Sequence, residues 1–200
     1  MLTVFHAPQS RSTRVLMLLE EMGARDRVAV HRVDITRRDG SGARDPANPH
    51  PEGKVPALVQ DGRVITESVA VMLHLTSVLK DHDMAPPVGG AQWGEYLSWM
   101  VWYGSVMEPV LILEMTGISN PALSRNFRGV AEVDARLRGA LDKGPWILGE
   151  TFSAADLLLH SPHIWLGKPH SDPVIQDWIA RCQARPATLR VLAEEAALGA

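Results

Sequence analysis

Cysteine is nearly missing from the sequence, because Cys182 is the single one in 200 residues. A lone cysteine cannot form an intramolecular disulfide, so a disulfide-stapled fold is excluded, and Cys182 is expected to fill a small core position on a helix. The start, Met1 followed by LTVFHAPQ, has no basic stretch leading into a long apolar run, as a secretory signal would. Together these features predict a cytoplasmic protein.

A surplus of positive charge is missing as well. Lys and Arg number 20 against 23 Asp and Glu, giving a formal net charge of -3. Nucleic acid, whose phosphates require a cationic surface, is therefore not an expected partner. Long apolar runs are also absent: the best candidate, around Tyr96–Met115, contains Glu108, Pro109 and Glu114, which predicts no transmembrane helix and no membrane partner.

What the chain does contain is enough apolar material for a core. Apolar residues make up 46% and charged residues 22%, values typical of soluble globular proteins. A chain of 200 residues forms one large domain or two small ones. The stretch Pro86-Pro87-Val88-Gly89-Gly90 is the predicted linker, since the pattern of elements changes there. We therefore expect domains at residues 1–82 and 91–200, joined by residues 83–90.

The first part mixes strands with helices. Expected elements are a strand at Leu2–His6, a helix ending at Gly23, a strand around Val28–Val33, a hairpin of Ala57–Val59 and Val64–Ile65, and a helix at Glu67–Lys80. Asp61-Gly62 is a dipeptide preferred in tight hairpin turns. The order βαβ and then ββα predicts a four-stranded mixed sheet covered by helices, the plan of thioredoxin-like domains.

The second part is predicted to be an all-α helical bundle. Expected helices are one long apolar helix at Gln92–Met115, an amphipathic one at Pro121–Leu141, one beginning at Ser153, and two more at Asp172–Ala184 and Pro186–Ala196. Ser153 and Asp156 have the spacing of a capping box, a feature of folding rather than catalysis. His160 and His163 have no thiolate or carboxylate cluster beside them, so no metal site is predicted.

The stretch HPEGKVPALVQDGRVITES, from His50 to Ser68, is the most informative for function. Pro56 has no backbone N–H to donate, so Val55 before it can pair its own N–H and C=O with an extended peptide. Ser68 and the free N–H groups of a helix start can hold a carboxylate, while Glu67 faces an ammonium group. These groups together would bind one amino-acid head group of a peptide-like ligand.

HPEGKVPAL followed by ITES resembles the glutathione-binding segment of the glutathione transferase family. PQSRSTRVLMLLEEMG resembles the first helix region of that family, and PWILGETFSAADLLL resembles its second-domain signature. The resemblance is nearest to bacterial and fungal members with a serine near the first helix. It implies a thioredoxin-like domain, an all-helical domain, a homodimer, glutathione as co-substrate, and no metal or redox cofactor.

The resemblance also implies roles for individual residues. By the family pattern, Pro56 would be a cis-proline and Val55 would pair through its backbone with the cysteinyl part of glutathione. Lys54 would lie near the glycine carboxylate, and Glu67 with Ser68 would hold the γ-glutamyl end. These last two roles agree with the charge argument made from the residues themselves.

The protein must then lower the pKa of the glutathione thiol, ordinarily about 8.5. Family tyrosines would fall near Phe5 or His6, and neither carries a phenol. Ser10, just before the first helix, supplies a hydroxyl donor beside a helix start; Ser12 is the rival, and either serine could instead be a simple helix N-cap. Gln9 stands where many serine-type members carry glycine, and His6 is expected to be a packed histidine.

An apolar electrophile would need a pocket beside the sulfur. Tyr96, Trp99, Tyr103 and Met107 recur at intervals of three or four on the long helix, and Tyr103 is the favoured pocket residue. Aromatic stripes at this spacing are also typical of packing, so a core role competes with the pocket role.

The resulting hypothesis is a glutathione transferase that activates glutathione as a thiolate and conjugates it to hydrophobic electrophiles. A glutathione-dependent isomerase, peroxidase or dehalogenase would use the same glutathione site. The competing class is a non-catalytic binding module that acts through protein partners. The combination of KVP and ITES argues against the module, because a chain that does not bind glutathione has no need of an acidic group at that helix start.

Overall fold

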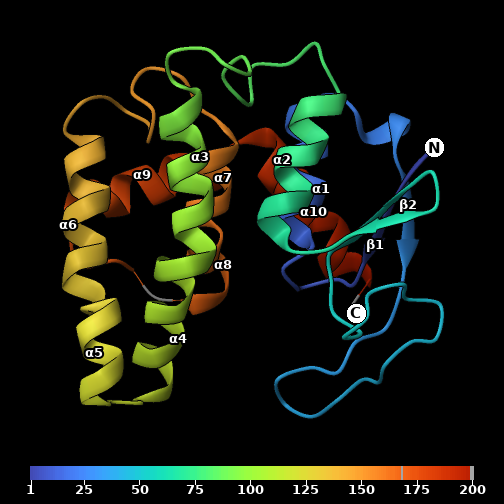
Figure 1. Cartoon of the computed structure of the whole chain (residues 1–200), viewed down its shortest axis with the longest axis horizontal. Coiled ribbons are helices and arrows are strands. Elements are labelled where there is room, and N and C mark those ends of the chain that lie inside the picture. Colours follow the sequence, from blue (N-terminus) through green and yellow to red (C-terminus); the bar gives the residue numbers. More distant parts are fainter. Residues whose placement is uncertain (168, 199–200) are drawn as a thin grey trace. The chain divides into compact units, whose positions relative to one another are not determined.

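A computed structural model describes residues 1–167 and 169–198 of the chain (Figure 1). It contains two compact units. The first is Met1–Met84 together with the segment from Arg185 onward, and the second is Ala85–Ala184. The boundary after Met84 lies inside the predicted linker, where residues 79–92 form neither helix nor strand. None of the helices within the described residues is long and apolar enough to cross a lipid bilayer.

The first unit is built on a four-stranded mixed sheet, as the sequence predicts. Its strands are β1 (Leu2–His6), β2 (Ala29–Arg32), β3 (Ala57–Gln60) and β4 (Arg63–Ile65). The spatial order is β2-β1-β3-β4, with β1 parallel to β2 and the other two pairs antiparallel. Asp61 and Gly62 both have positive φ, at 48° and 76°, which is the backbone that a tight two-residue hairpin turn requires.

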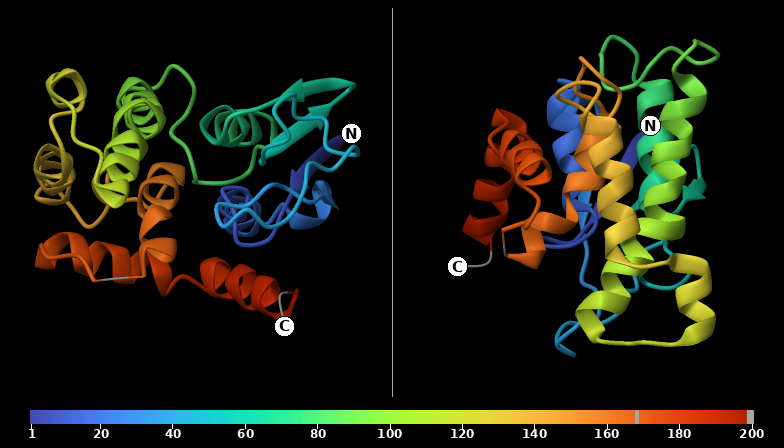
Figure 2. Two further views of the ribbon diagram at one scale, coloured as in Figure 1. Left: turned by 90° about the horizontal axis from the view of Figure 1, so that it is seen from below. Right: turned by 90° about the vertical axis from the view of Figure 1, so that its left-hand side faces the viewer.

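Helices α1 (Thr13–Glu21) and α2 (Ser68–Val78) contact each other and pack on the sheet (Figures 1 and 2). Most buried residues of α1 are apolar, and Arg14 and Thr13 are buried with them. Gly23, at φ 59°, ends the last turn in the left-handed region as predicted. A short 3-10 helix, η1 (Arg25–Arg27), leads into β2. The fold therefore places the start of α1 directly after the end of β1.

A long irregular segment joins β2 to β3. Its two ends are fixed by a small apolar cluster of Ala7, Val33 and Val55, with Phe5 packed against it. The Val55–Pro56 peptide bond is cis, in agreement with the pattern implied by the resemblance. This cluster brings the segment before β3 beside the loop that follows β1.

The C-terminal helix α10 (Pro186–Leu198) packs on α1 and belongs to the first unit (Figure 2). The sequence-based division instead counts it with the second domain. Helix α10 packs in the first unit because it carries a buried stripe, made of Ala187, Thr188, Val191 and Glu195. In addition, the guanidinium of Arg185 donates two hydrogen bonds to the carboxylate of Glu21, at 2.6 and 2.7 Å.

In the second unit, the predicted long helix at Gln92–Met115 is interrupted. It consists of α3 (Trp93–Trp102), a π-helical turn η2 (Tyr103–Met107) and α4 (Glu108–Thr116). Pro109 explains the change, because it lacks an N–H and its ring clashes with the carbonyl four residues earlier in a regular α-helix. The wider π turn accommodates the proline while the chain continues along the same path (Figure 1).

The prediction of one helix at Pro121–Leu141 is wrong. The structure has two helices there, α5 (Pro121–Phe127) and α6 (Val130–Leu141). Arg128 and Gly129 between them have φ of 55° and 95°, and left-handed residues cannot continue a right-handed helix. The unit is completed by α7 (Ala154–His160), α8 (Pro162–Leu166) and α9 (Pro173–Gln183), and Cys182 on α9 is buried as expected.

The predicted capping box is present at the start of α7. The hydroxyl of Ser153 accepts from the Ala155 N–H at 3.3 Å, and the Asp156 carboxylate accepts from the Ser153 N–H at 3.0 Å. The other carboxylate oxygen of Asp156 accepts from the Ile147 N–H at 2.8 Å and from the Trp178 indole N–H at 3.0 Å. Asp156 therefore ties the loop before α7 to α9 inside the core.

Candidate functional site

The loop between β1 and α1 carries the first candidate residue. Ser10 is half-buried, and its Oγ donates to the carbonyl oxygen of Ala7 at 2.6 Å and accepts from the Ser12 N–H at 3.1 Å. Gln9 before it has φ 55°, a left-handed conformation that glycine adopts freely. The loop therefore has a backbone conformation suited to glycine although the residue is glutamine. The fold thus presents a serine hydroxyl immediately before the first turn of α1.

Ser12, the rival serine, is completely buried. Its Oγ lies 2.8 Å from Nδ1 of His6 and 2.7 Å from Oγ of Ser10, and it accepts from the Ala7 N–H at 3.1 Å. Ser12 occupies the N-cap position of α1, but its hydroxyl makes no capping hydrogen bond. Ser10 Oγ accepts from the Ser12 N–H just before the helix, and Ser10 is the more exposed of the two serines.

Glu195 is a site residue that the sequence reasoning missed. It lies on α10 with 3% of its surface exposed, and its Oε2 accepts from the Gln9 N–H at 2.7 Å. Its Oε1 accepts from the Thr13 hydroxyl at 2.7 Å and lies 3.5 Å from Nε2 of His6. The available signal is its spacing, four residues after Val191, which places a carboxylate on the buried stripe of α10.

Burial shifts the two ionisable groups of this cluster in opposite senses. Desolvation raises the pKa of Glu195 above its ordinary value. Desolvation lowers the pKa of His6 to about 4, with the charges of Arg25 and Arg32 acting in the same direction. His6 is therefore a neutral, buried and hydrogen-bonded histidine, as the sequence interpretation expected.

The segment before β3 lies at the same edge of the sheet. Phe5, near the end of β1, pairs with Ala57 at the start of β3. Val55 lies two residues before Ala57, so it is at the edge of the sheet where β1 ends, and it shares an apolar cluster with Ala7. Within residues 1–167 and 169–198, the backbone N–H and C=O of Val55 have no hydrogen-bond partner. The carbonyl of Lys54 accepts from the Asn48 amide at 3.0 Å, which holds this segment in place. An extended ligand can therefore pair with Val55.

Lys54 is exposed and its ammonium group is paired with the carboxylate of Glu52. This pair lies on the surface, where an ion pair contributes about 1 kcal/mol or less. A ligand carboxylate can therefore compete for Lys54 without a large loss of stability.

Glu67 and Ser68 mark the start of α2. Because Ile65 pairs with Leu58, Glu67 follows at the edge where β3 begins, which is also where β1 ends. Glu67 is exposed and has φ 69°, a left-handed conformation that is unusual for glutamate. In the part of the chain that the structure describes, its carboxylate has no hydrogen-bonding side chain. The sheet thus gathers Ser10, Val55 and Glu67 along one edge.

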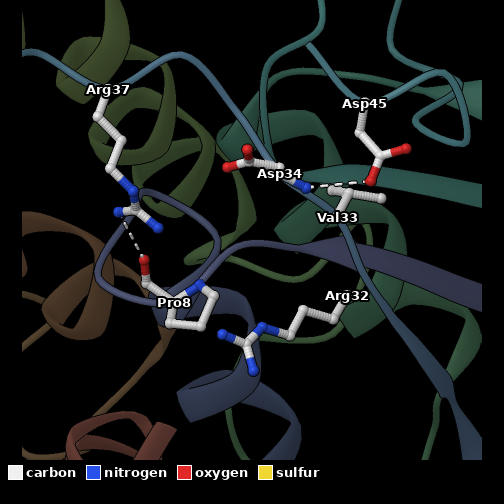
Figure 3. Close-up of a pocket in the computed structure, with 6 residues that line it drawn as sticks. All are labelled: Pro8, Arg32, Val33, Asp34, Arg37 and Asp45. Atoms are coloured by element: carbon white, nitrogen blue, oxygen red, sulfur yellow. Dashed lines mark hydrogen bonds between the residues drawn. The ribbon is translucent and has the colours of Figure 1, made fainter. Parts of the chain in front are cut away.

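A pocket of about 270 Å³ lies beside the loop between β1 and α1, which contributes Pro8 to its lining (Figure 3). The carboxylates of Asp34 and Asp45 accept loop backbone N–H groups, while the Arg37 guanidinium donates to the Pro8 carbonyl oxygen at 3.2 Å. The lining of this pocket does not include the residues predicted to bind glutathione. The lining residues are Pro8, Arg32, Val33, Asp34, Arg37 and Asp45.

The four residues predicted for an electrophile pocket lie in the second unit and are buried. The hydroxyl of Tyr103 donates to the Glu108 carboxylate at 2.7 Å, and the Arg136 guanidinium lies 4.6 Å from the centroid of the Trp99 ring. These contacts give Tyr103 and Trp99 packing partners in their own unit. Their pocket role, like that of Tyr96 and Met107, stays a prediction.

Comparison with known proteins finds similarity to glutathione transferases in both sequence and structure. Residues 10–78 match the family model of the glutathione S-transferase N-terminal domain. The chain is 26% identical over 168 residues to glutathione S-transferase GstA of Escherichia coli O157:H7, covering 81% of each protein. The crystal structure of glutathione transferase from Methylococcus capsulatus str. bath superposes with a TM-score of 0.80 at 25% identity, over 98% of this chain and 99% of that one.

The chain is similar to members of the glutathione transferase family in both sequence and structure. The predicted fold class is confirmed: a thioredoxin-like domain accompanied by helices. A sphingomonad glutathione S-transferase complexed with glutathione is also similar, with a TM-score of 0.74 and 25% identity over 97% of this chain and 98% of that one. The assignment to serine-type members of the family stays a prediction.

Proposed function

We propose that this protein is a member of the glutathione transferase family that binds glutathione, ionises its thiol and transfers the thiolate to a hydrophobic electrophile. The observation that carries the proposal is the Ser10 hydroxyl, half-buried just before α1 at the edge where Val55 has an unpaired backbone. The similarity to a sphingomonad relative in complex with glutathione supports glutathione as the ligand.

Binding would use both charged ends of the tripeptide. The N–H and C=O of Val55 would pair with the backbone of the cysteinyl residue, as in one rung of an antiparallel ladder. The γ-glutamyl ammonium would face Glu67, and its carboxylate would take the hydroxyl of Ser68 and the free N–H groups at the start of α2. The ammonium group of Lys54 would release the carboxylate of Glu52 and pair with the glycine carboxylate of glutathione.

The hydroxyl of Ser10 would stabilise the thiolate. In the structure its hydrogen points to the Ala7 carbonyl, and turning about the Cβ–Oγ bond redirects it toward a sulfur at the mouth of the loop. A thiol pKa lower by about two units corresponds to about 2.7 kcal/mol of preference for the thiolate. One hydroxyl donor and the positive end of α1 can together supply that preference.

The chemical step then needs no metal or redox cofactor. The thiolate forms a carbon–sulfur bond with the electrophile, and either a leaving group departs with its electron pair or a proton adds to the product. Following the family resemblance, we propose that the protein acts as a homodimer and in the cytoplasm.

The direct test is a titration of bound glutathione by ultraviolet thiolate absorbance, together with turnover of 1-chloro-2,4-dinitrobenzene. The expected result is saturable glutathione binding, a thiol pKa about two units below that of free glutathione, and release of the thioether product. No binding at millimolar glutathione would overturn the proposal. Binding without ionisation or turnover would reduce the protein to a glutathione-binding module.

Replacing Glu67 with glutamine should weaken glutathione binding by about tenfold, because a charge-assisted contact to the γ-glutamyl ammonium is lost. The thiol pKa of the glutathione that still binds should stay unchanged, since Glu67 does not face the sulfur. Isothermal titration calorimetry measures the affinity. The control is Asp61→Asn, which removes an exposed carboxylate on the β3–β4 hairpin. Equal affinities of Glu67→Gln and the unmodified protein would remove Glu67 from the site.

A further inference from the structure

A line of polar side chains runs inward from Ser10 and ends on the last helix. Ser10 Oγ lies 2.7 Å from Ser12 Oγ, Ser12 Oγ lies 2.8 Å from His6 Nδ1, and His6 Nε2 lies 3.5 Å from Glu195 Oε1. Ser12, His6 and Glu195 are each at most 4% exposed. The proposed catalytic hydroxyl is therefore the outer end of a buried polar chain whose inner end is a carboxylate.

Neighbouring groups fix the orientation of this chain without joining it. The Ala7 N–H donates to Ser12 Oγ at 3.1 Å. The Thr13 hydroxyl and the Gln9 N–H each donate to one oxygen of Glu195 at 2.7 Å. The hydrogens that remain free to choose a direction are those of Ser10, Ser12 and His6, the members of the chain itself.

The carbonyl oxygen of Ala7 is a second acceptor for both hydroxyls, at 2.6 Å from Ser10 Oγ and 3.2 Å from Ser12 Oγ. When the hydrogens instead lie along the chain, they have two consistent arrangements. With Glu195 ionised, His6 carries its hydrogen on Nε2 toward the carboxylate, so Nδ1 accepts from Ser12 and Ser12 can accept from Ser10. With Glu195 protonated, every bond reverses and Ser12 donates to Ser10. Ser10 Oγ then accepts from both the hydroxyl and the backbone N–H of Ser12, so its own hydrogen is directed away from the chain.

We propose, building on the thiolate function above, that Ser12, His6 and Glu195 relay the thiol proton of glutathione from Ser10 to the Glu195 carboxylate. The S–H bond breaks and its proton goes to Ser10 Oγ, while Ser10 gives its own proton to Ser12. Ser12 gives its proton to Nδ1 of His6, and His6 gives its Nε2 proton to Glu195. The products are a thiolate and a neutral carboxylic acid, so charge and protons balance.

The second arrangement is also the one that stabilises the thiolate. After the relay, the Ser10 hydrogen is directed outward, toward the sulfur that has just lost its proton. Proton removal and donor alignment are therefore the same event. Ser12, His6 and Glu195 do not touch the substrate and act as positioning residues for Ser10.

Burial supports Glu195 as the proton acceptor, while the hydrogen bonds from the Thr13 hydroxyl and the Gln9 N–H lower its pKa and act against it. Burial raises the pKa of Glu195, so a buried carboxylate takes a proton more readily than an exposed one. The charged groups that face it are Arg37 from the segment after β2, which opposes protonation, and Glu194 on the same helix, which favours it. Desolvation outweighs both.

The electrostatics of His6 suit a relay through its two tautomers. Its pKa, lowered to about 4, shows that a charged imidazolium is disfavoured, with Arg25 of η1 and Arg32 of β2 as the facing cations. A neutral imidazole can still take a proton at one nitrogen while it releases one from the other. The 3.5 Å between Nε2 and Oε1 exceeds a normal hydrogen bond, so the transfer requires Glu195 to move closer by about half an ångström.

The test compares Glu195→Gln with Glu132→Gln, which removes an exposed carboxylate on α6 that lies outside the polar chain. Glutamine keeps the size of Glu195 but cannot take the proton. We expect Glu195→Gln to raise the thiol pKa of bound glutathione by about one unit or more, a tenfold or larger loss of thiolate at fixed pH. Glu132→Gln should leave that pKa unchanged. Affinity for S-methylglutathione, which has no thiol proton, should be the same in both variants.

A second variant, His6→Asn, keeps an acceptor near Ser12 but cannot pass a proton to Glu195. It should raise the thiol pKa as Glu195→Gln does. Melting temperatures separate this effect from loss of folding. A normal thiol pKa in folded Glu195→Gln and His6→Asn would overturn the relay while the proposed function stands. Failure of the unmodified protein to bind S-methylglutathione or glutathione would instead overturn the function itself.

Discussion

Replacing Ser10 with alanine is expected to raise the thiol pKa of bound glutathione by about two units and to lower kcat/KM about 100-fold near neutral pH. The variant loses the hydroxyl that reaches the ligand, and with it the outer end of the chain that leads to Glu195. The affinity for S-methylglutathione should change little, because the Val55 and Glu67 contacts remain. Thiolate absorbance measures the pKa, and 1-chloro-2,4-dinitrobenzene turnover measures the rate.

Two further variants make this expectation specific. Ser77→Ala removes an exposed hydroxyl on α2 of the same unit and should behave like the unmodified protein. Ser12→Ala should raise the thiol pKa less than Ser10→Ala, since it breaks the relay and leaves the outer donor. If Ser10→Ala titrates normally and Ser12→Ala does not, the thiolate donor is Ser12.

Replacing Asp156 with alanine is expected to destabilise the second unit by about 3 to 5 kcal/mol. The carboxylate is completely buried and accepts hydrogen bonds from Ile147, Trp178 and Ser153, whose donors would be left unpaired in the core. For a chain of this length the loss corresponds to a melting temperature lower by about 10 °C. Differential scanning calorimetry measures it, with Asp142→Ala, an exposed carboxylate on the same unit, as control. A change below about 1 kcal/mol would contradict the assigned role.

Asp156 should also leave a signature in the pH dependence of stability. Burial raises its pKa from 3.8 to about 6, so between these values the unfolded chain releases a proton that the folded chain keeps. The contribution to stability is therefore full below pH 3.8 and is lost as the pH rises to about 6, a fall of about 3 kcal/mol. Urea unfolding at several pH values should show this fall in the unmodified protein and not in Asp156→Asn. Equal slopes would show that another group is responsible.

Local patterns were sufficient for most of the first unit. The short apolar, β-prone run of β1 and the Asp61-Gly62 turn depend on neighbouring residues, so the sheet and its hairpin could be predicted. The helix boundaries in the second unit were harder. Pro109 and Gly129 are visible in the sequence, but one widens a helix that continues while the other ends it. Whether the helix continues or ends at such a residue depends on tertiary packing, which the local sequence pattern does not encode.

The site divides in the same way. Val55, Pro56, Glu67 and Ser68 lie within one short segment, so their joint role could be inferred from their order. Spacing could not separate Ser10 from Ser12, because the difference is burial of one hydroxyl by the surrounding fold. Glu195 lies 186 positions after Gln9, which it contacts, and a contact between such distant positions is decided by tertiary packing.

The location of Glu195 has a consequence for how the protein is made. A ribosome that has synthesised the entire sheet, α1 and α2 has still not produced the carboxylate that holds the loop after β1. The nascent thioredoxin-like unit must wait for the second unit to be translated before this loop obtains its last two hydrogen bonds. Maturation of the site is thereby linked to the synthesis of α10.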